Sequence, residues 1–246
     1  MRMMGIALVA LFTISAVIAV AAQGTEGPFW KVNGSRLAAG QVALILASAK
    51  KTFTLQNPVS KVKIECSAFN LSEHSTINGS SGANAGTSKE VIEYSGCTGG
   101  AKEEGENCKP QSGKITTTLV TNTLGYSRDT KIGSLVLVLF KPSVGSTFTT
   151  ITFEGTNCFA ASTAVTGSTI GEATVNGKFI HVGSEPAEEL SGQVRFIKGN
   201  KSILVENGGT LTNFKSGLTA FGTAASLEGE ALIDLSNGNK WGVFTA

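Results

Sequence analysis

Hydrophobic and polar side chains alternate along several short stretches of this chain. In residues 60–66, Val62, Ile64 and Cys66 occupy alternate positions, and the positions between them carry two lysines and a glutamate. Residues 193–196 and 227–235 repeat the alternation. Successive side chains of a β-strand point to opposite faces. The pattern therefore predicts antiparallel strands with one face toward a core and the other toward water.

A second pattern marks a strand that is apolar on both faces. Residues 135–140 are hydrophobic at every position. We expect a central strand covered on each side, ending at Lys141 and Pro142 because proline cannot donate a ladder hydrogen bond. Asn237 and Gly238 tolerate the positive φ angles of a type I′ turn, and they predict a hairpin near the C-terminal end.

The remaining sequence favours short strands and turns over helices. It contains 30 glycines together with many serines and threonines, a composition typical of strands joined by tight turns. Only residues 184–190 carry the capping serine, early proline and acidic first turn of a short helix. We predict an all-β fold for residues 23–246: one antiparallel domain, built as a β-sandwich or as a barrel-like sheet.

Residues 1–22 have the composition of an export signal. Arg2 precedes an uncharged apolar run that closes on Ala19, Val20 and Ala21, the small-x-small pattern that a signal peptidase cuts. We expect a cleaved signal peptide and a secreted or extracytoplasmic protein. An uncleaved membrane anchor is the alternative, since the run is about as long as the shortest spanning helix. The small residues at its end favour cleavage, so no membrane span is expected afterwards.

The charge balance excludes one class of partner. The chain carries 20 basic and 18 acidic residues, and 15% of all residues are charged. Nucleic-acid binding needs clustered lysine and arginine. We therefore expect no nucleic acid among the partners.

Four cysteines, an even number, fit an oxidising compartment. Cys97 and Cys108 flank a polar, glycine-bearing stretch that is typical of a hairpin tip, and we expect a disulfide between them. Cys66 and Cys158 would then form the second disulfide. Zinc fits the spacing poorly because no C-x-x-C occurs, and we expect no metal and no cofactor.

The side chains needed for acid–base or nucleophilic catalysis are scarce. A Ser–His–Asp arrangement would have to combine His74 or His181 with Asp129 or Asp234. No G-x-S-x-G motif occurs. Paired carboxylates of a glycosidase stay open, because such pairs meet only in three dimensions. We assign no catalytic residue, and the sequence favours a protein that is not an enzyme.

The two tryptophans, Trp30 and Trp241, are the candidate residues for ligand stacking. Exposed aromatic rings on a β-scaffold would stack on sugars. The alternative is that both fill the core where the first and last strands meet, because large aromatic side chains dominate core burial. We favour the core.

Short segments spread over most of the chain carry a resemblance to a family. They are residues 30–34, 63–66, 94–97 with Cys108, 113–117, 165–168 and 237–242. In these segments the chain resembles a set of uncharacterised, signal-peptide-bearing, β-rich bacterial proteins. That resemblance implies export and disulfide bonds, and it implies no activity.

The scarcity of clustered ionisable residues favours a non-enzymatic protein of the cell envelope or the extracellular space, with a structural or binding role. The alternatives are a carbohydrate-binding module or glycan-active hydrolase, and an adhesin or assembly subunit. The corresponding partners would be a cell-wall glycan or another envelope protein.

Overall fold

The computed structural model describes residues 27–82, 84–101, 103, 107–127, 135–175, 178–180, 188–196, 201–207 and 210–244. The predicted signal peptide, Asp129, His181 and residues 184–187 lie outside these ranges. The elements are β1 Phe29–Val32, β2 Ser35–Arg36, β3 Val42–Gln56, β4 Lys63–Leu71, β5 Thr76–Asn78, β6 Thr87–Glu90, β7 Ile92–Gly99, β8 Cys108–Pro110, the 3-10 turn Gln111–Gly113, β9 Lys114–Thr116, β10 Val120–Ser127, β11 Val136–Pro142, β12 Thr147–Gly155, β13 Ser162–Val175, β14 Lys178–Phe179, β15 Ser191–Phe196, β16 Lys201–Asn207, β17 Thr210–Ala220, β18 Thr223–Leu235 and β19 Trp241–Phe244.

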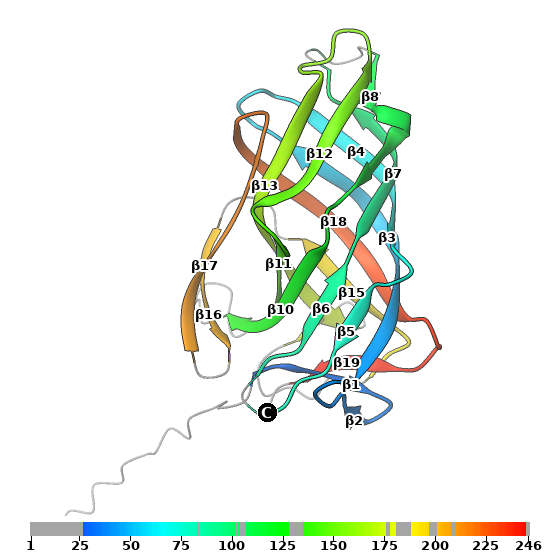
Figure 1. The fold of residues 1–246 in the computed structure, drawn as a ribbon, viewed down its shortest axis with the longest axis vertical. Coiled ribbons are helices and arrows are strands. Elements are labelled where there is room, and N and C mark those ends of the chain that lie inside the picture. The colour runs from blue at the N-terminus through cyan, green and yellow to red at the C-terminus, as the bar shows by residue number, and fades with distance from the viewer. Residues whose placement is uncertain are drawn as a thin grey trace, which may run out of the picture.

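Eight of these strands close into a barrel, which Figure 1 shows from the side. The hydrogen-bonded circuit runs β13, β15, β18, β3, β5, β6, β10 and β11, and β11 returns to β13. Every pairing along it is antiparallel, and Leu137 opposite Glu172 is one register position of the closing pair. The all-β, antiparallel prediction is therefore confirmed, and of its two alternatives the structure takes the barrel.

Three long strands extend the barrel at one end. β3 has 15 residues, β13 has 14 and β18 has 13, and at about 3.3 Å per residue the longest spans about 50 Å. Their far halves pair with β4, β12 and β17. We call the eight-stranded circuit the lower tier and this extension the upper tier, as they stand in Figure 1.

A separate three-stranded sheet closes the lower tier. It has the order β19-β1-β2 and lies at the lower end in Figure 1. Trp30 and Trp241 are each only 5% exposed, and their rings meet edge to face at 5.7 Å. Their indole N–H groups donate to the carbonyl oxygens of Thr87 and Ile233 at 2.9 and 3.1 Å. Both tryptophans are thus in the core, as the favoured alternative predicted, and neither shows a face to an external sugar.

The hairpin predicted at Asn237 and Gly238 is wrong. Gly238 does have a positive φ of 71°, and its N–H donates to the Leu235 carbonyl in a turn. The strands on either side of the turn do not pair with one another, because β18 pairs with β3, β15 and β17, whereas β19 pairs with β1. The turn therefore transfers the chain from the barrel wall to the small sheet.

The alternating stretches became strands in the predicted orientation, except that residues 60–62 precede β4, which begins at Lys63. In β4, Ile64 and Cys66 are buried, whereas Lys63 is exposed. The doubly apolar stretch became β11, which ends at Pro142 as expected. Val136, Val138 and Phe140 face the barrel core. Leu135, Leu137 and Leu139 form an outer cluster with Ile170, and Phe214 of β17 packs against it.

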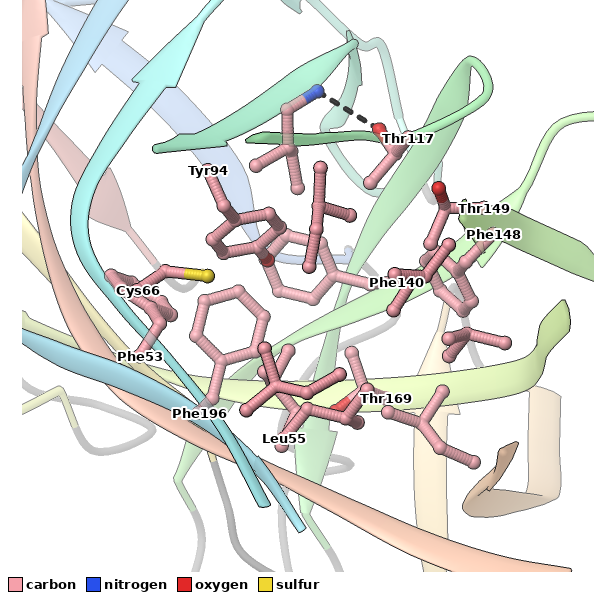
Figure 2. A pocket seen from close by; sticks show the side chains of 17 residues that line it. Phe53, Leu55, Cys66, Tyr94, Thr117, Phe140, Phe148, Thr149, Thr169 and Phe196 are labelled. Atoms are coloured by element: carbon pink, nitrogen blue, oxygen red, sulfur yellow. Dashed lines mark hydrogen bonds between the residues drawn. The ribbon is translucent and has the colours of Figure 1, made fainter. Parts of the chain in front are cut away.

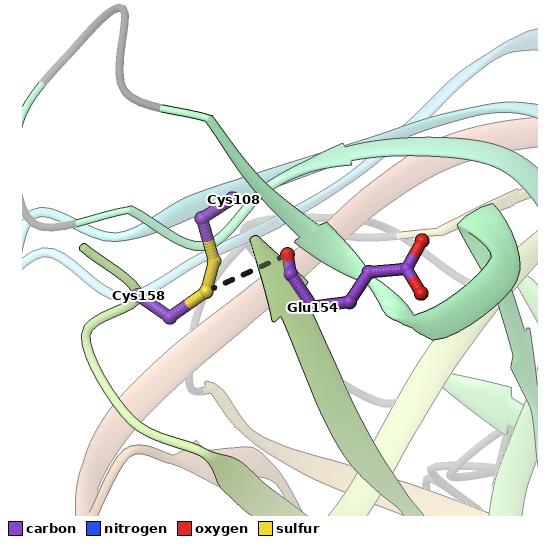
Figure 3. The surroundings of a disulfide bond; sticks show 3 residues. All are labelled: Cys108, Glu154 and Cys158. Carbon is purple, nitrogen blue, oxygen red and sulfur yellow. Dashed lines mark hydrogen bonds between the residues drawn. A yellow bond between two sulfur atoms is a disulfide. The ribbon is translucent and has the colours of Figure 1, made fainter. Parts of the chain in front are cut away.

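The disulfide pairing predicted from the sequence is wrong. The bonds join Cys66 to Cys97 and Cys108 to Cys158. Cys66 lies directly opposite Cys97 where β4 pairs with β7, with their Cα atoms 4.0 Å apart. Cys108 begins β8, which pairs with β12 instead of β7. Cys108 therefore meets Cys158, which lies just beyond the end of β12. The Cys158 Sγ atom is 3.7 Å from the Glu154 carbonyl oxygen (Figure 3).

Candidate functional site

The barrel interior contains two small chambers, one in each tier. The upper chamber has a volume of about 60 Å³, and the lower chamber about 30 Å³. Phe140 and Phe196 line both, so these two rings mark the boundary. The interior is the candidate site because side chains from most of the barrel strands converge on it.

A cluster of aromatic rings forms this boundary. Phe53 stacks on Phe69 at 4.6 Å between ring centroids and meets Tyr94 and Phe196 at 5.3 and 5.7 Å. Phe140 meets Phe196 at 4.9 Å. Offset and edge-to-face contacts at such distances stabilise aromatic packing. We call these five side chains the aromatic partition.

The upper chamber is almost entirely apolar (Figure 2). Its polar lining residues, apart from Tyr94, are three threonines. The Thr117 hydroxyl accepts a hydrogen bond from the Ile92 N–H at 2.9 Å. The Thr149 hydroxyl donates to the Thr116 carbonyl at 2.7 Å. Two of the three hydroxyls thus serve the backbone, and the chamber offers mainly hydrocarbon. Its other lining residues are Phe53, Leu55, Ile64, Cys66, Ile92, Ile115, Phe140, Phe148, Ile151, Val165, Phe196, Leu218 and Leu227.

The lower chamber differs because three polar side chains enter it. Ser88 and Glu90 lie two positions apart on β6 and so share its inward face. Asn122 lies on the neighbouring strand β10, opposite Ser88 in register. The Asn122 Nδ2 donates to Ser88 Oγ at 2.8 Å. The Asn122 Oδ1 atom is buried and has no hydrogen-bond partner.

Glu90 is the ionisable residue of this group. It is 6% exposed, and burial raises the pKa of its carboxyl to about 7, although a hydrogen bond with the Asn122 side chain acts in the opposite direction. Burial, and secondarily the charge of Glu90, also raises the pKa of the Tyr94 phenol above its usual value. No lysine, arginine or histidine is among the described residues that line the chamber.

The outer face of the barrel holds a separate, charged hollow of about 600 Å³. There Lys51 and Lys50 approach the Glu230 carboxylate at 2.7 and 3.0 Å. Burial opposes ionisation of Glu230, but these two lysines outweigh it and lower the pKa of the carboxyl. Arg195 pairs with Glu172 nearby. These carboxylates are held in ion pairs, which fits a role in stabilising the wall.

The residues considered for catalysis are not brought together. His74 is exposed in the turn between β4 and β5. Asp234 lies on β18, and β3 separates this strand from β5 and the turn that carries His74. The Asp234 carboxylate accepts a hydrogen bond from the Ser191 hydroxyl. Asp129 and His181 lie outside the described residues. Within the described ranges, no group of three or more histidine, cysteine, aspartate or glutamate residues is placed to hold a metal ion.

Sequence reasoning missed Ser88, Glu90 and Asn122. A signal for all three was present. Ser88 and Glu90 continue backward the inward alternation of Ile92 and Tyr94, so that Glu90 is a carboxyl group at a core position. Asn122 alternates in the same way with Val120, Leu124 and Tyr126, and only its position opposite Ser88 depends on the pairing of β10 with β6.

Across the part of the chain that is described, no helix is long and apolar enough to cross a membrane. Two disulfides are typical of proteins outside the cytoplasm. No family model, no curated protein and no solved structure matches the chain.

Proposed function

We propose that this is a non-enzymatic binding protein of the extracytoplasmic space, and that its barrel interior takes up a small apolar molecule. The observation that carries the proposal is the upper chamber, a hydrocarbon-lined space between the strands of the upper tier. Apolar cavities in proteins stay dry and take up apolar atoms and molecules. The chamber has the chemistry of such a site.

The lining of the upper chamber supports binding over catalysis. Its described residues include no histidine, carboxylate or lysine. Its cysteine, Cys66, is bonded to Cys97, and two of its three threonine hydroxyls are engaged with backbone groups. Neither a general base nor an activated nucleophile is thus supplied at the chamber wall.

The size of the chamber limits the ligand. A cavity of roughly 150 Å³ accommodates benzene or xenon, whereas the upper chamber measures about 60 Å³. A single heavy noble-gas atom or a group of a few carbon atoms therefore matches it better than a drug-sized molecule, which needs roughly 300 Å³ or more.

Location outside the cytoplasm is supported by the two disulfides and by the signal-like sequence of residues 1–22. Sequencing the N-terminus of protein recovered from the producing cells tests this part. A new N-terminus near residue 22 or 23 is the expected result, and an intact Met1 would contradict it.

Xenon binding tests the interior site directly. We expect dissolved xenon to shift the methyl resonances of Ile64, Ile115 and Leu218 in the full chain, because these side chains line the upper chamber. The substitution Val165→Leu adds a methylene group at the wall and should weaken binding several-fold.

The matched control is Val144→Leu, which makes the same change at a side chain that is 85% exposed. This variant should bind xenon like the unaltered protein. Resonance shifts confined to surface methyl groups, or equal binding by the two variants, would contradict the interior site.

A further inference from the structure

The lower chamber has more hydrogen-bond acceptors than donors. The Asn122 Oδ1 atom is buried without a partner in a residue that is 1% exposed. Glu90 adds two carboxyl oxygens. One Asn122 Nδ2 hydrogen is donated to Ser88 Oγ, and the Asn122 side chain also hydrogen-bonds to the Glu90 carboxyl. The Ser88 hydroxyl proton is the one further donor among these three side chains, so Asn122 Oδ1 and the carboxyl oxygens still outnumber the donors when Glu90 is ionised. A buried acceptor without a donor is costly, so the group is chemically matched to an occupant that donates hydrogen bonds.

The charge inventory of the chamber points the same way. Glu90 from β6 is the one ionisable side chain among its described lining residues, and Tyr94 of β7 is the phenol that feels its charge. The other described lining residues are uncharged. Their polar groups are the Ser88 and Asn122 side chains and the indole N–H groups of Trp30 and Trp241, which donate to backbone carbonyls. An ionised Glu90 would therefore have no cationic partner among these residues.

Aromatic rings make up much of the wall. Five of the lining residues are aromatic: Trp30, Phe69, Phe140, Phe196 and Trp241. A ring face attracts a cation through its quadrupole, most strongly in tryptophan. Aromatic walls together with one carboxylate form the chemical environment that recognises an organic ammonium group.

We propose that the lower chamber binds the ammonium group of a small primary alkylamine, with N–H groups donating to Glu90 and to Asn122 Oδ1. The alkyl part lies toward the aromatic partition, where Phe140 and Phe196 also line the upper chamber. The inference goes beyond the proposed function, since it assigns a cationic ligand to a second chamber of the same interior. A volume of about 30 Å³ exceeds the roughly 10–15 Å³ that one water molecule needs, which suits a single ammonium group.

Isothermal titration of the full chain tests this with three probes of similar shape: propylammonium, propan-1-ol and propionate. Propylammonium should bind most tightly, and propionate should not bind. At about pH 8.5, where Glu90 is ionised and the amine is still protonated, its affinity should be on the order of tenfold higher than at about pH 5.5.

Two substitutions test the assigned contacts. Glu90→Gln keeps the shape of the side chain, and it should lower the affinity for propylammonium at least tenfold and abolish its pH dependence. Asn122→Leu removes the acceptor and should also weaken binding. The matched control is Glu93→Gln, the same change at an exposed residue of β7, which should leave binding unchanged.

If either core variant fails to fold, a pH titration of the Glu90 carboxyl resonance in the unaltered protein takes its place. Propylammonium should lower the pKa that this titration gives. Equal affinities for amine and alcohol, tighter binding of propionate, or an unmoved Glu90 titration would overturn the inference. Xenon binding in the upper chamber would still stand in that case, so the two proposals fail separately.

Discussion

Glu90 places a carboxyl group on the inward face of β6, where hydration is weakest. Its pKa of about 7 follows from burial without a neighbouring cation. Glu230 is also buried, but Lys50 and Lys51 lie beside it, and its pKa is lowered instead. The pKa of a buried glutamate is thus raised at one position and lowered at the other, and the direction depends on whether a cationic side chain lies beside the carboxyl.

The pKa of Glu90 predicts how stability depends on pH. The folded protein binds a proton at Glu90 more tightly than the unfolded chain, whose pKa is near 4.5. The contribution of Glu90 to the free energy of unfolding is therefore complete below about pH 4.5 and is lost as the pH rises through about 7. At 1.36 kcal/mol per pKa unit, the loss is about 3 kcal/mol. Urea unfolding across this range measures it.

The comparison that isolates the effect is between two variants. Glu90→Gln should remove this pH-dependent loss, so that the variant is more stable than the unaltered protein above pH 7. Glu93→Gln, at an exposed site, should keep the loss. A Glu90→Gln variant with an unchanged slope would show that another group is responsible.

At the level of the strands, each disulfide links segments that backbone pairing already holds next to each other. Cys66 and Cys97 tie β4 to β7 across one register position. Cys108 and Cys158 tie β8 to the segment that follows β12. The bonds close loops of 31 and 50 residues in sequence separation. In the loop-entropy account each stabilises the fold by about 4 kcal/mol.

Removing the first bond tests its contribution. The double substitution Cys66→Ala and Cys97→Ala should lower the free energy of unfolding by about 2–4 kcal/mol, measured by urea denaturation. Proteolysis without reduction followed by mass spectrometry should yield a peptide pair that links residues 66 and 97. A pair that links Cys97 to Cys108 would contradict the observed connectivity.

The parts of this fold that are visible in the sequence are local ones. The alternation around Ile64 and the apolar run of β11 specify strands and faces by themselves, and both appeared in the structure as expected. The disulfide partners depend on which strands become neighbours. Cys97 is nearer to Cys108 than to Cys66 along the chain, yet the pairing of β4 with β7 places Cys66 opposite Cys97. No local sequence pattern indicates that β4 and β7 are neighbours.

The candidate site was predictable only in part. The alternation along each strand indicates that Glu90 and Asn122 face the core, but the pairing of β10 with β6, which brings them together, is not specified by any local pattern. The aromatic partition also depends on a distant glycine, because a Cβ atom at Gly229 would lie 2.4 Å from Phe53 Cδ1. The ring occupies the space that Gly229 leaves open, and neither residue alone indicates the contact.

In the molecule as a whole, β3, β13 and β18 belong to both tiers. If β3, β13 and β18 unfolded in one tier, the other tier would lose part of its sheet. Most contacts join segments far apart along the chain, as in other all-β folds, and such topologies fold slowly because loop closure precedes the stabilising contacts.

The shared strands predict that the two tiers unfold together. The methyl resonances of Ile151 in the upper tier and Val138 in the lower tier should disappear at the same urea concentration, with one transition for both. Both side chains are almost fully buried, so each reports on its own core. A Val138 transition at clearly lower urea would show that the lower tier opens independently.

The sheet that carries Trp30 and Trp241 joins segments from opposite ends of the described chain. The Lys240 N–H donates to Asn33 Oδ1 across 207 positions of sequence. Among the described strands, β1 pairs only with β19 and with the two-residue β2. During synthesis, β1 therefore cannot pair with β19 until more than 200 further residues have been made. Until then Trp30 lacks the ring of Trp241 against which it packs, and the lower chamber lacks the part of its lining that Trp241 contributes. All eight strands of the closed circuit are therefore synthesised before β19, the strand that completes the small sheet closing the lower tier.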